Sequence, residues 1–143
     1  MSAFRRRASR GQALVEFSLT VLIFLVLLMG IFDFGRAIFM YNGVAQAARE
    51  IARVTSVHPG SPLGASAETL AVVSTQKNLI PNLGNPTYKC MNVDNSAVGA
   101  SKPCVPQEHS VKVTISAVYT PVTPILSFLG DIKLSSSSSA KIQ

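Results

Sequence analysis

Glu16 is a carboxylate at the start of an otherwise apolar run, with Gly11 five residues before it and Phe17 beside it. An ionised group at mid-bilayer costs about 2.5–3.5 kcal/mol, and less near the membrane surface, where the side chain can reach water. A cut after Gly11 would free an α-amino group at Gln12. In a parallel helix bundle, Glu16 of one copy could then pair with that amino group in the next. A single costly polar pair of this kind can fix the register between helices.

The two cysteines, Cys90 and Cys104, are the second place where chemistry is expected. Their spacing fits neither a C-x-x-C redox motif nor a zinc pattern. A bridge between them would close a loop of about 15 residues, worth about 3 kcal/mol in the chain-entropy model. We predict a disulfide, with two free thiols as the alternative.

The sequence contains no recognisable set of catalytic residues. His58 and His109 stand alone, and the carboxylates of the second half of the chain lie far apart. Motifs for zinc proteases, nucleophile elbows and phosphate-binding loops are absent. We therefore expect a non-enzymatic protein without a cofactor or a metal site.

The positive charge is concentrated at the N-terminus. The formal net charge is +6, and four arginines ahead of the apolar run supply much of it, leaving 6 − 4 = +2 for the rest: Arg5, Arg6, Arg7 and Arg10. The lysines further on are scattered singly, so no basic stripe remains to follow the phosphates of a nucleic acid. The charge instead indicates membrane orientation, with the N-terminus in the cytoplasm.

Residues 13–32 are long and apolar enough to cross a bilayer, since about 20 helical residues span its core of about 30 Å. Three interpretations fit a basic flank followed by such a run: a secretory signal peptide, an uncleaved anchor, and a leader cut before the run. No small-x-small cleavage site follows the run, which argues against the first. The pairing argument for Gly11 and Glu16 favours the third.

Beyond the run, we expect the helix to continue to residue 57, just before His58-Pro59-Gly60, as the spine of an outer domain. Asp33 and Arg36 can face each other on it. A second helix is expected at residues 65–79, with Leu70, Val73 and Ile80 inward. Strands are expected at 87–93, at 111–119 and from 132 to 142 through the serine run 135–139, for which a disordered tail is the alternative. Six residues form the expected inner face of the long helix: Ile38, Tyr41, Val44, Ala48, Ile51 and Ala52.

The fold class is thus α+β and pilin-like: one long helix, a short second helix and an antiparallel sheet of about three strands. Three segments are expected. They are a basic leader (1–11), a long N-terminal helix (12–57, crossing the membrane at about 13–32) and an extracytoplasmic domain (58–143).

The first third of the chain also resembles a known family. The pattern RxxxxRGQALVEF, a leucine-rich run, then DFGRA and AREIAR resembles the TadE-like (TadE/TadG) family of the Flp/Tad tight-adherence system, a type IVb pilus system. The resemblance implies a pseudopilin or minor pilin, with Gly11 before the peptidase cut and Glu16 as the assembly glutamate. Phe17 stands where major Flp pilins usually have tyrosine.

Several partners follow from this resemblance. They are a prepilin peptidase, other pilin or pseudopilin subunits, lipid of the bacterial inner membrane and the Tad assembly machinery. The protein would be an inner-membrane precursor that becomes part of an extracellular pilus after processing. The alternative is an unprocessed single-span protein whose outer domain binds secretion machinery.

Overall fold

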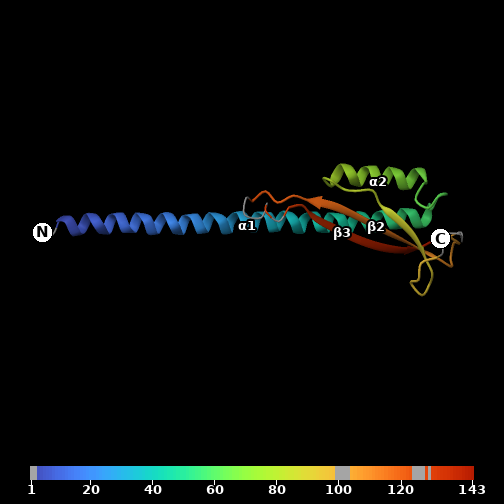
Figure 1. Cartoon of the computed structure of the whole chain (residues 1–143). Helices are drawn as coiled ribbons and strands as arrows, with labels where there is room; N and C mark the ends of the chain where they lie inside the picture. The colour runs from blue at the N-terminus through green and yellow to red at the C-terminus, as the bar shows by residue number, and fades with distance from the viewer. Residues whose placement is uncertain (1–2, 99–103, 124–127, 129) are drawn as a thin grey trace.

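One helix, α1 (Ala3–Val57), runs through the entire fold and carries an outer domain on its second half (Figure 1). The computed structural model describes residues 3–98, 104–123, 128 and 130–143, with side chains from Gly11 onward. At 55 residues, α1 is about 80 Å long. Its end at Val57, just before His58 and Pro59, is where the sequence predicted it.

The start of α1 differs from the prediction. The helix begins at Ala3 and passes through the basic flank, whereas we expected it to begin at residue 12. Arginine and alanine are good helix formers, and one glycine at position 11 costs only about 1 kcal/mol relative to alanine. Nothing in the flank therefore ends the helix before the apolar run.

Three antiparallel strands form the sheet, in the order β1-β2-β3: β1 (Thr87–Met91), β2 (Ser110–Tyr119) and β3 (Ile132–Lys141). The serine run is part of β3, since residues 135–139 pair with residues 112–116 of β2. Every second serine of the run is half-buried, in step with Ala140 and Ile142. The alternation thus predicted the strand correctly despite its disorder-prone composition.

Strand β1 is shorter than the predicted 87–93. It ends at Met91 because a turn follows at once, in which the Asn92 amide donates to the Ser96 carbonyl at 2.8 Å. Asp94 fixes this turn by accepting from the backbone and hydroxyl of Ser96.

The core lies between the inner face of β2 and the second half of α1. All five predicted inner residues of β2 are buried: Val111, Val113, Ile115, Ala117 and Tyr119. Opposite them, Val44, Ala48, Ile51 and Ala52 of α1 are buried as predicted, together with Ala47. The small alanines let the sheet approach the helix closely.

The predicted inner face of α1 was wrong at its membrane-proximal end. Ile38 and Tyr41 are about half exposed. The buried stripe instead continues from Val44 through the half-buried Met40 to Asp33. The pattern of apolar residues could not predict which face of α1 is buried here, because the buried stripe ends at a charged residue, Asp33.

Helix α2 (Ala67–Leu79) packs against α1. Ser66 caps it by accepting from the Thr69 amide at 3.2 Å, which places the start two residues after the predicted one. Val73 and Ile80 are buried as predicted, but Leu70 is 56% exposed. Thr69 takes the inner position because its hydroxyl lies 3.2 Å from the His58 carbonyl, to which it donates. That contact turns Leu70 outward.

Candidate functional site

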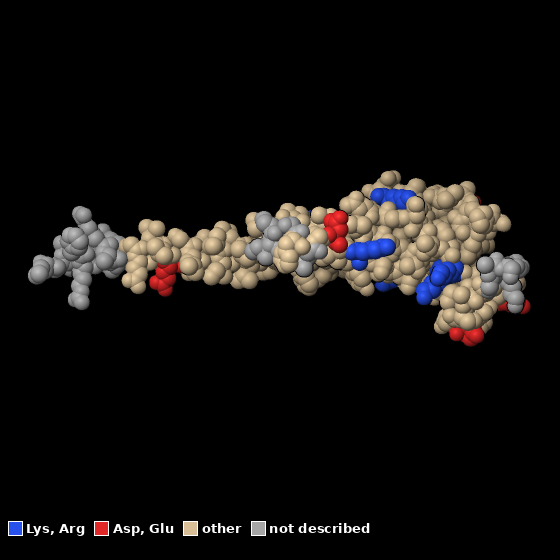
Figure 2. Space-filling view, viewed as in Figure 1, with Lys and Arg blue, Asp and Glu red and all other residues tan. Residues whose placement is uncertain are grey.

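Residues 11–32 of α1 form a largely exposed, mainly apolar rod. It is long and apolar enough to cross a membrane, and none of its most apolar window is buried by the rest of the chain. Figure 2 shows this narrow half almost free of charged atoms on the visible face, with one acidic patch near its start. Between residues 11 and 32, Glu16 is the only charged residue in the sequence.

The polar groups around Glu16 are satisfied within the helix. The Ser18 hydroxyl donates to the Leu14 carbonyl at 2.7 Å, and the Thr20 hydroxyl to the Glu16 carbonyl at 2.8 Å. This back-bonding to the preceding turn is how hydroxyls are accommodated on apolar helices. Within the described part of the chain, no hydrogen bond or ion pair reaches the Glu16 carboxylate.

The other expected residues of the processing site are on the same rod. Gly11 and Gln12 are exposed, Phe17 is 68% exposed, and no neighbour approaches the position where a Cβ on Gly11 would lie. The N-terminal end of α1 lies far from the outer domain (Figure 1).

Asp33 is the residue that the sequence reasoning misplaced. We expected it to face Arg36, but it is only 4% exposed and turns toward the segment after β2. The amides of Val122 and Thr123 donate to its two carboxylate oxygens at 3.2 and 2.8 Å, and the Thr123 hydroxyl donates as well. The Tyr119 hydroxyl lies 2.8 Å from the Asp33 carbonyl oxygen and 3.2 Å from the carboxylate. Asp33 therefore fastens the outer domain to α1 just past the apolar run.

These donors favour the ionised carboxylate. They hold the pKa of Asp33 below its ordinary value, the Thr123 side chain contributing most, while burial acts in the opposite direction. Burial and the charge of Asp33 together raise the pKa of Tyr119. The Tyr119 hydroxyl thus stays protonated and remains a donor to Asp33.

Arg36 lies over the Tyr119 ring, 5.8 Å from its centroid, within the range of a cation–π contact. It sits in an open, mainly apolar groove of about 500 Å³ beside α1. Six residues that line the groove carry the argument below: Ile31, Phe32, Gly35, Arg36, Phe39 and Tyr119.

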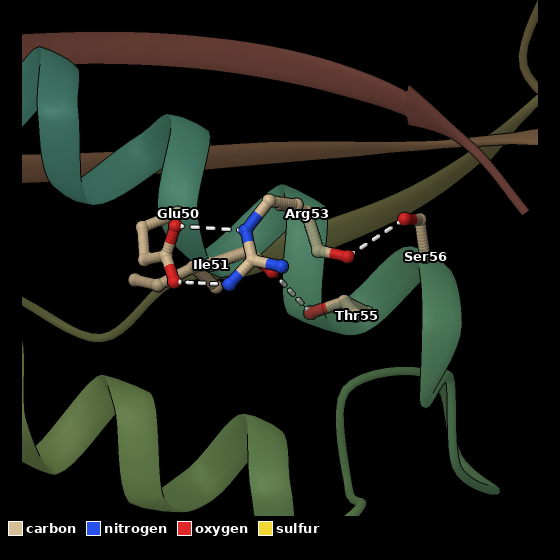
Figure 3. Close-up of polar contacts among 5 residues, drawn as sticks. All are labelled: Glu50, Ile51, Arg53, Thr55 and Ser56. Carbon is tan, nitrogen blue, oxygen red and sulfur yellow. Dashed lines mark hydrogen bonds and ion pairs between the residues drawn. The ribbon is translucent and has the colours of Figure 1, made fainter.

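Near its C-terminal end, α1 carries an ion pair between Glu50 and Arg53 (Figure 3). The Arg53 guanidinium donates twice to Glu50, at 3.0 and 2.6 Å, which lowers the pKa of Glu50. The Arg53 side chain is largely exposed and that of Glu50 is partly exposed, so the pair adds little to stability. Thr55 and Ser56 donate to carbonyls of the preceding turn and complete the helix end.

Cys90 and Cys104 form the expected disulfide, with their Cα atoms 5.9 Å apart. His109 lies close by, so that one ligand atom from each of these three residues falls within 4.8 Å of the others. Oxidation removes both thiolates, however, and the His109 Nδ1 already accepts from the Val105 amide at 2.8 Å. With the disulfide formed, these three residues hold the loop ends of the outer domain together.

The residues singled out from the sequence therefore fall in two places. Gly11, Gln12, Glu16 and Phe17 lie on the exposed rod, and the disulfide lies in the outer domain. Sequence reasoning missed Asp33 and the groove at Arg36. The partners of Asp33 are 86 to 90 residues away, so no local pattern could reveal them.

Comparison with protein families identifies the first part of the chain. The family model described as TadE-like protein matches residues 11–53, which include the rod, the groove residues of α1 and much of its buried stripe. A search of curated proteins and a search of solved structures find no match to this chain.

Proposed function

We propose that this chain, whose residues 11–53 are a TadE-like family domain, is a pseudopilin or minor pilin of a Tad-type (type IVb) pilus or secretion apparatus. The observation that carries the proposal is the exposed apolar rod with a single unpaired carboxylate among its described residues. A rod of this kind is suited first to a membrane and then to a bundle of like helices. The role is structural rather than enzymatic.

The membrane stage follows from the rod and its flank. The arginines at positions 5, 6, 7 and 10 favour an N-terminus in the cytoplasm, which would put the outer domain on the other side of the inner membrane. The disulfide fits this location, because thiols oxidise outside the cytoplasm. Inner-membrane lipid is then the first partner of the rod.

The assembly stage requires processing. A prepilin peptidase would cut after Gly11, remove the basic leader and leave Gln12 with a free α-amino group. Glu16, followed by Phe17, would become the fifth residue of the mature chain and pair with that amino group in a neighbouring subunit. The Tad machinery would supply the neighbours, and the pilus would take the subunit out of the membrane.

The processing step is tested by the intact mass of the protein recovered from membranes or pili. We expect a chain that begins at Gln12. A chain that still contains the arginines of residues 5–10 in cells with an active prepilin peptidase would favour the alternative, an unprocessed single-span protein that binds secretion machinery through its outer domain.

The assembly role of the carboxylate is tested with Glu16→Ala. We expect normal trimming but strongly reduced recovery in sheared pili, because the α-amino group of the neighbour loses its counter-charge. Glu68→Ala is the matched control, since Glu68 is an exposed glutamate on α2, away from the rod. Equal recovery of both variants in pili would remove the role given to Glu16.

A further inference from the structure

The groove at Arg36 and the start of the rod are complementary in composition. The groove is mainly apolar and has one charged lining residue, Arg36, and the rod is mainly apolar and has one charged residue, Glu16. Phe39 is 80% exposed and Phe32 is 68% exposed, so the groove walls are uncovered in the single chain. Gly35 lies in the groove with no atom near its missing Cβ, which leaves room for the close approach of a helix.

From this complementarity we propose that the groove at Arg36 binds the Glu16 end of α1 from a second copy of this chain, with an ion pair between the two side chains. The inference rests on the proposed assembly function and names a contact within it. An arginine fork and a carboxylate make a strong, directional pair in a water-poor site. A carboxylate has two oxygens, so Glu16 can accept from Arg36 of one neighbour and from the Gln12 amine of another.

The spacing of the two residues determines the kind of assembly. They are 36 − 16 = 20 residues apart on one continuous helix, which corresponds to about 30 Å along the axis and about 200° around it. Glu16 and Arg36 thus point to nearly opposite sides of α1. A copy that binds a neighbour through its groove presents its own Glu16 on the far side. This heterologous contact cannot close into a dimer and continues as a chain.

The same offset fits the size of the outer domain. The domain is attached to α1 from Asp33, where Thr123 and Tyr119 are bound, to Val57 at the helix end. This stretch of 57 − 33 = 24 residues is about 36 Å long. A second copy displaced outward by about 30 Å would place its domain next to the end of the first, while its rod covers the first copy's groove.

Photo-crosslinking in cells that make the protein and assemble its pili tests the contact. The full chain carries p-benzoylphenylalanine in place of Phe39, and a second, tagged copy is co-expressed. We expect adducts between copies that map to residues 11–20 of the tagged copy. Tyr41 is the matched control position, because it is a half-exposed aromatic residue on the same helix that does not line the groove.

The charge pair is tested in the same assay. Arg36→Glu in the copy with the crosslinker should reduce the adduct by at least about tenfold, whereas Arg49→Glu, an exposed arginine elsewhere on α1, should leave it unchanged. A tagged copy with Glu16→Arg should restore the adduct to the Arg36→Glu copy. Retention of the Cys90–Cys104 disulfide and of the melting temperature shows that the variants are folded.

The outcomes separate this inference from the proposed function. Phe39 adducts to lipid, to a different protein or to another segment, in a chain that is trimmed after Gly11, overturn the inference alone. The same holds if Arg36→Glu leaves the adduct unchanged. An untrimmed chain in peptidase-competent cells overturns the proposed function, whatever the adducts are.

Discussion

Two carboxylates on α1, Asp33 and Glu16, differ in burial and in hydrogen bonding. Asp33 is buried and receives its hydrogen bonds from Tyr119, Val122 and Thr123 of the same chain. Glu16 is exposed, and among the described residues nothing pairs with it. A buried carboxylate with several hydrogen bonds serves the fold of one molecule, so we assign Asp33 to folding. An exposed carboxylate on an apolar rod is free to pair with a second molecule, which is why the proposed function gives Glu16 an assembly role.

Asp33→Asn should loosen the outer domain at its membrane-proximal end. Asparagine keeps one acceptor oxygen but replaces the other with an NH₂ group, which would face a backbone N–H. We expect the melting temperature to fall by several degrees and the amides of Val122 and Thr123 to exchange faster with solvent. Asp94→Asn is the control, because Asp94 serves only an exposed turn. Equal exchange in both variants would contradict the role given to Asp33.

The same contact makes stability depend on pH in a defined direction. The pKa of Asp33 is lower in the folded chain than in the unfolded chain, for which about 3.9 is the ordinary value. Its contribution is thus present above that value and is lost as the pH falls through the lower, folded pKa. The Asp33→Asn variant should therefore lose less stability than the parent chain between neutral pH and acid, as measured by thermal melting.

At the scale of elements, the sequence predicts best where one hydrophobic pattern determines both the type of an element, helix or strand, and which of its faces is buried. Strand β2 alternates so strictly that its end at Tyr119 and all five inner residues were correct, and its start at Ser110 lies one residue before the predicted one. Helix α2 was located, but one residue of its predicted inner face was wrong, because a count of hydrophobic residues prefers Leu70 to the hydrogen-bonded Thr69. The groove at Arg36 could not be predicted at all, since Tyr119 reaches it from a distant strand.

Ala47 tests how closely the sheet lies on α1. It is fully buried in the core between α1 and the sheet. Ala47→Leu adds three carbon atoms to a packed site and should destabilise the domain by about 1–3 kcal/mol. Gln46→Leu, the same residue introduced one position earlier on the exposed side, should change the free energy of unfolding by less than about 0.5 kcal/mol. Similar unfolding curves for the two variants would show that the core can expand.

At the scale of the molecule, the disulfide secures the end of the outer domain opposite the membrane. It closes a loop between positions 14 residues apart. Replacing Cys90 and Cys104 together by serine should cost about 3 kcal/mol of unfolding free energy through the greater entropy of the unfolded chain. Reductant should produce the same loss in the parent chain and none in the variant. A parent chain that melts identically with and without reductant would contradict this role.

The two halves of the molecule should also be separable, because their contacts are confined to different stretches of α1. All the contacts between α1 and the core described above lie from Asp33 onward, apart from one long hydrogen bond to the Met29 carbonyl. A chain of residues 33–143 should therefore fold, keep its disulfide and stay in solution without detergent. A chain of residues 49–143 lacks Asp33, Val44, Ala47 and Ala48 and should not melt cooperatively. Circular dichroism with thermal melting compares the two. If the longer chain failed to fold, residues 11–32 would contribute to the stability of the outer domain in addition to the membrane and assembly roles proposed for them.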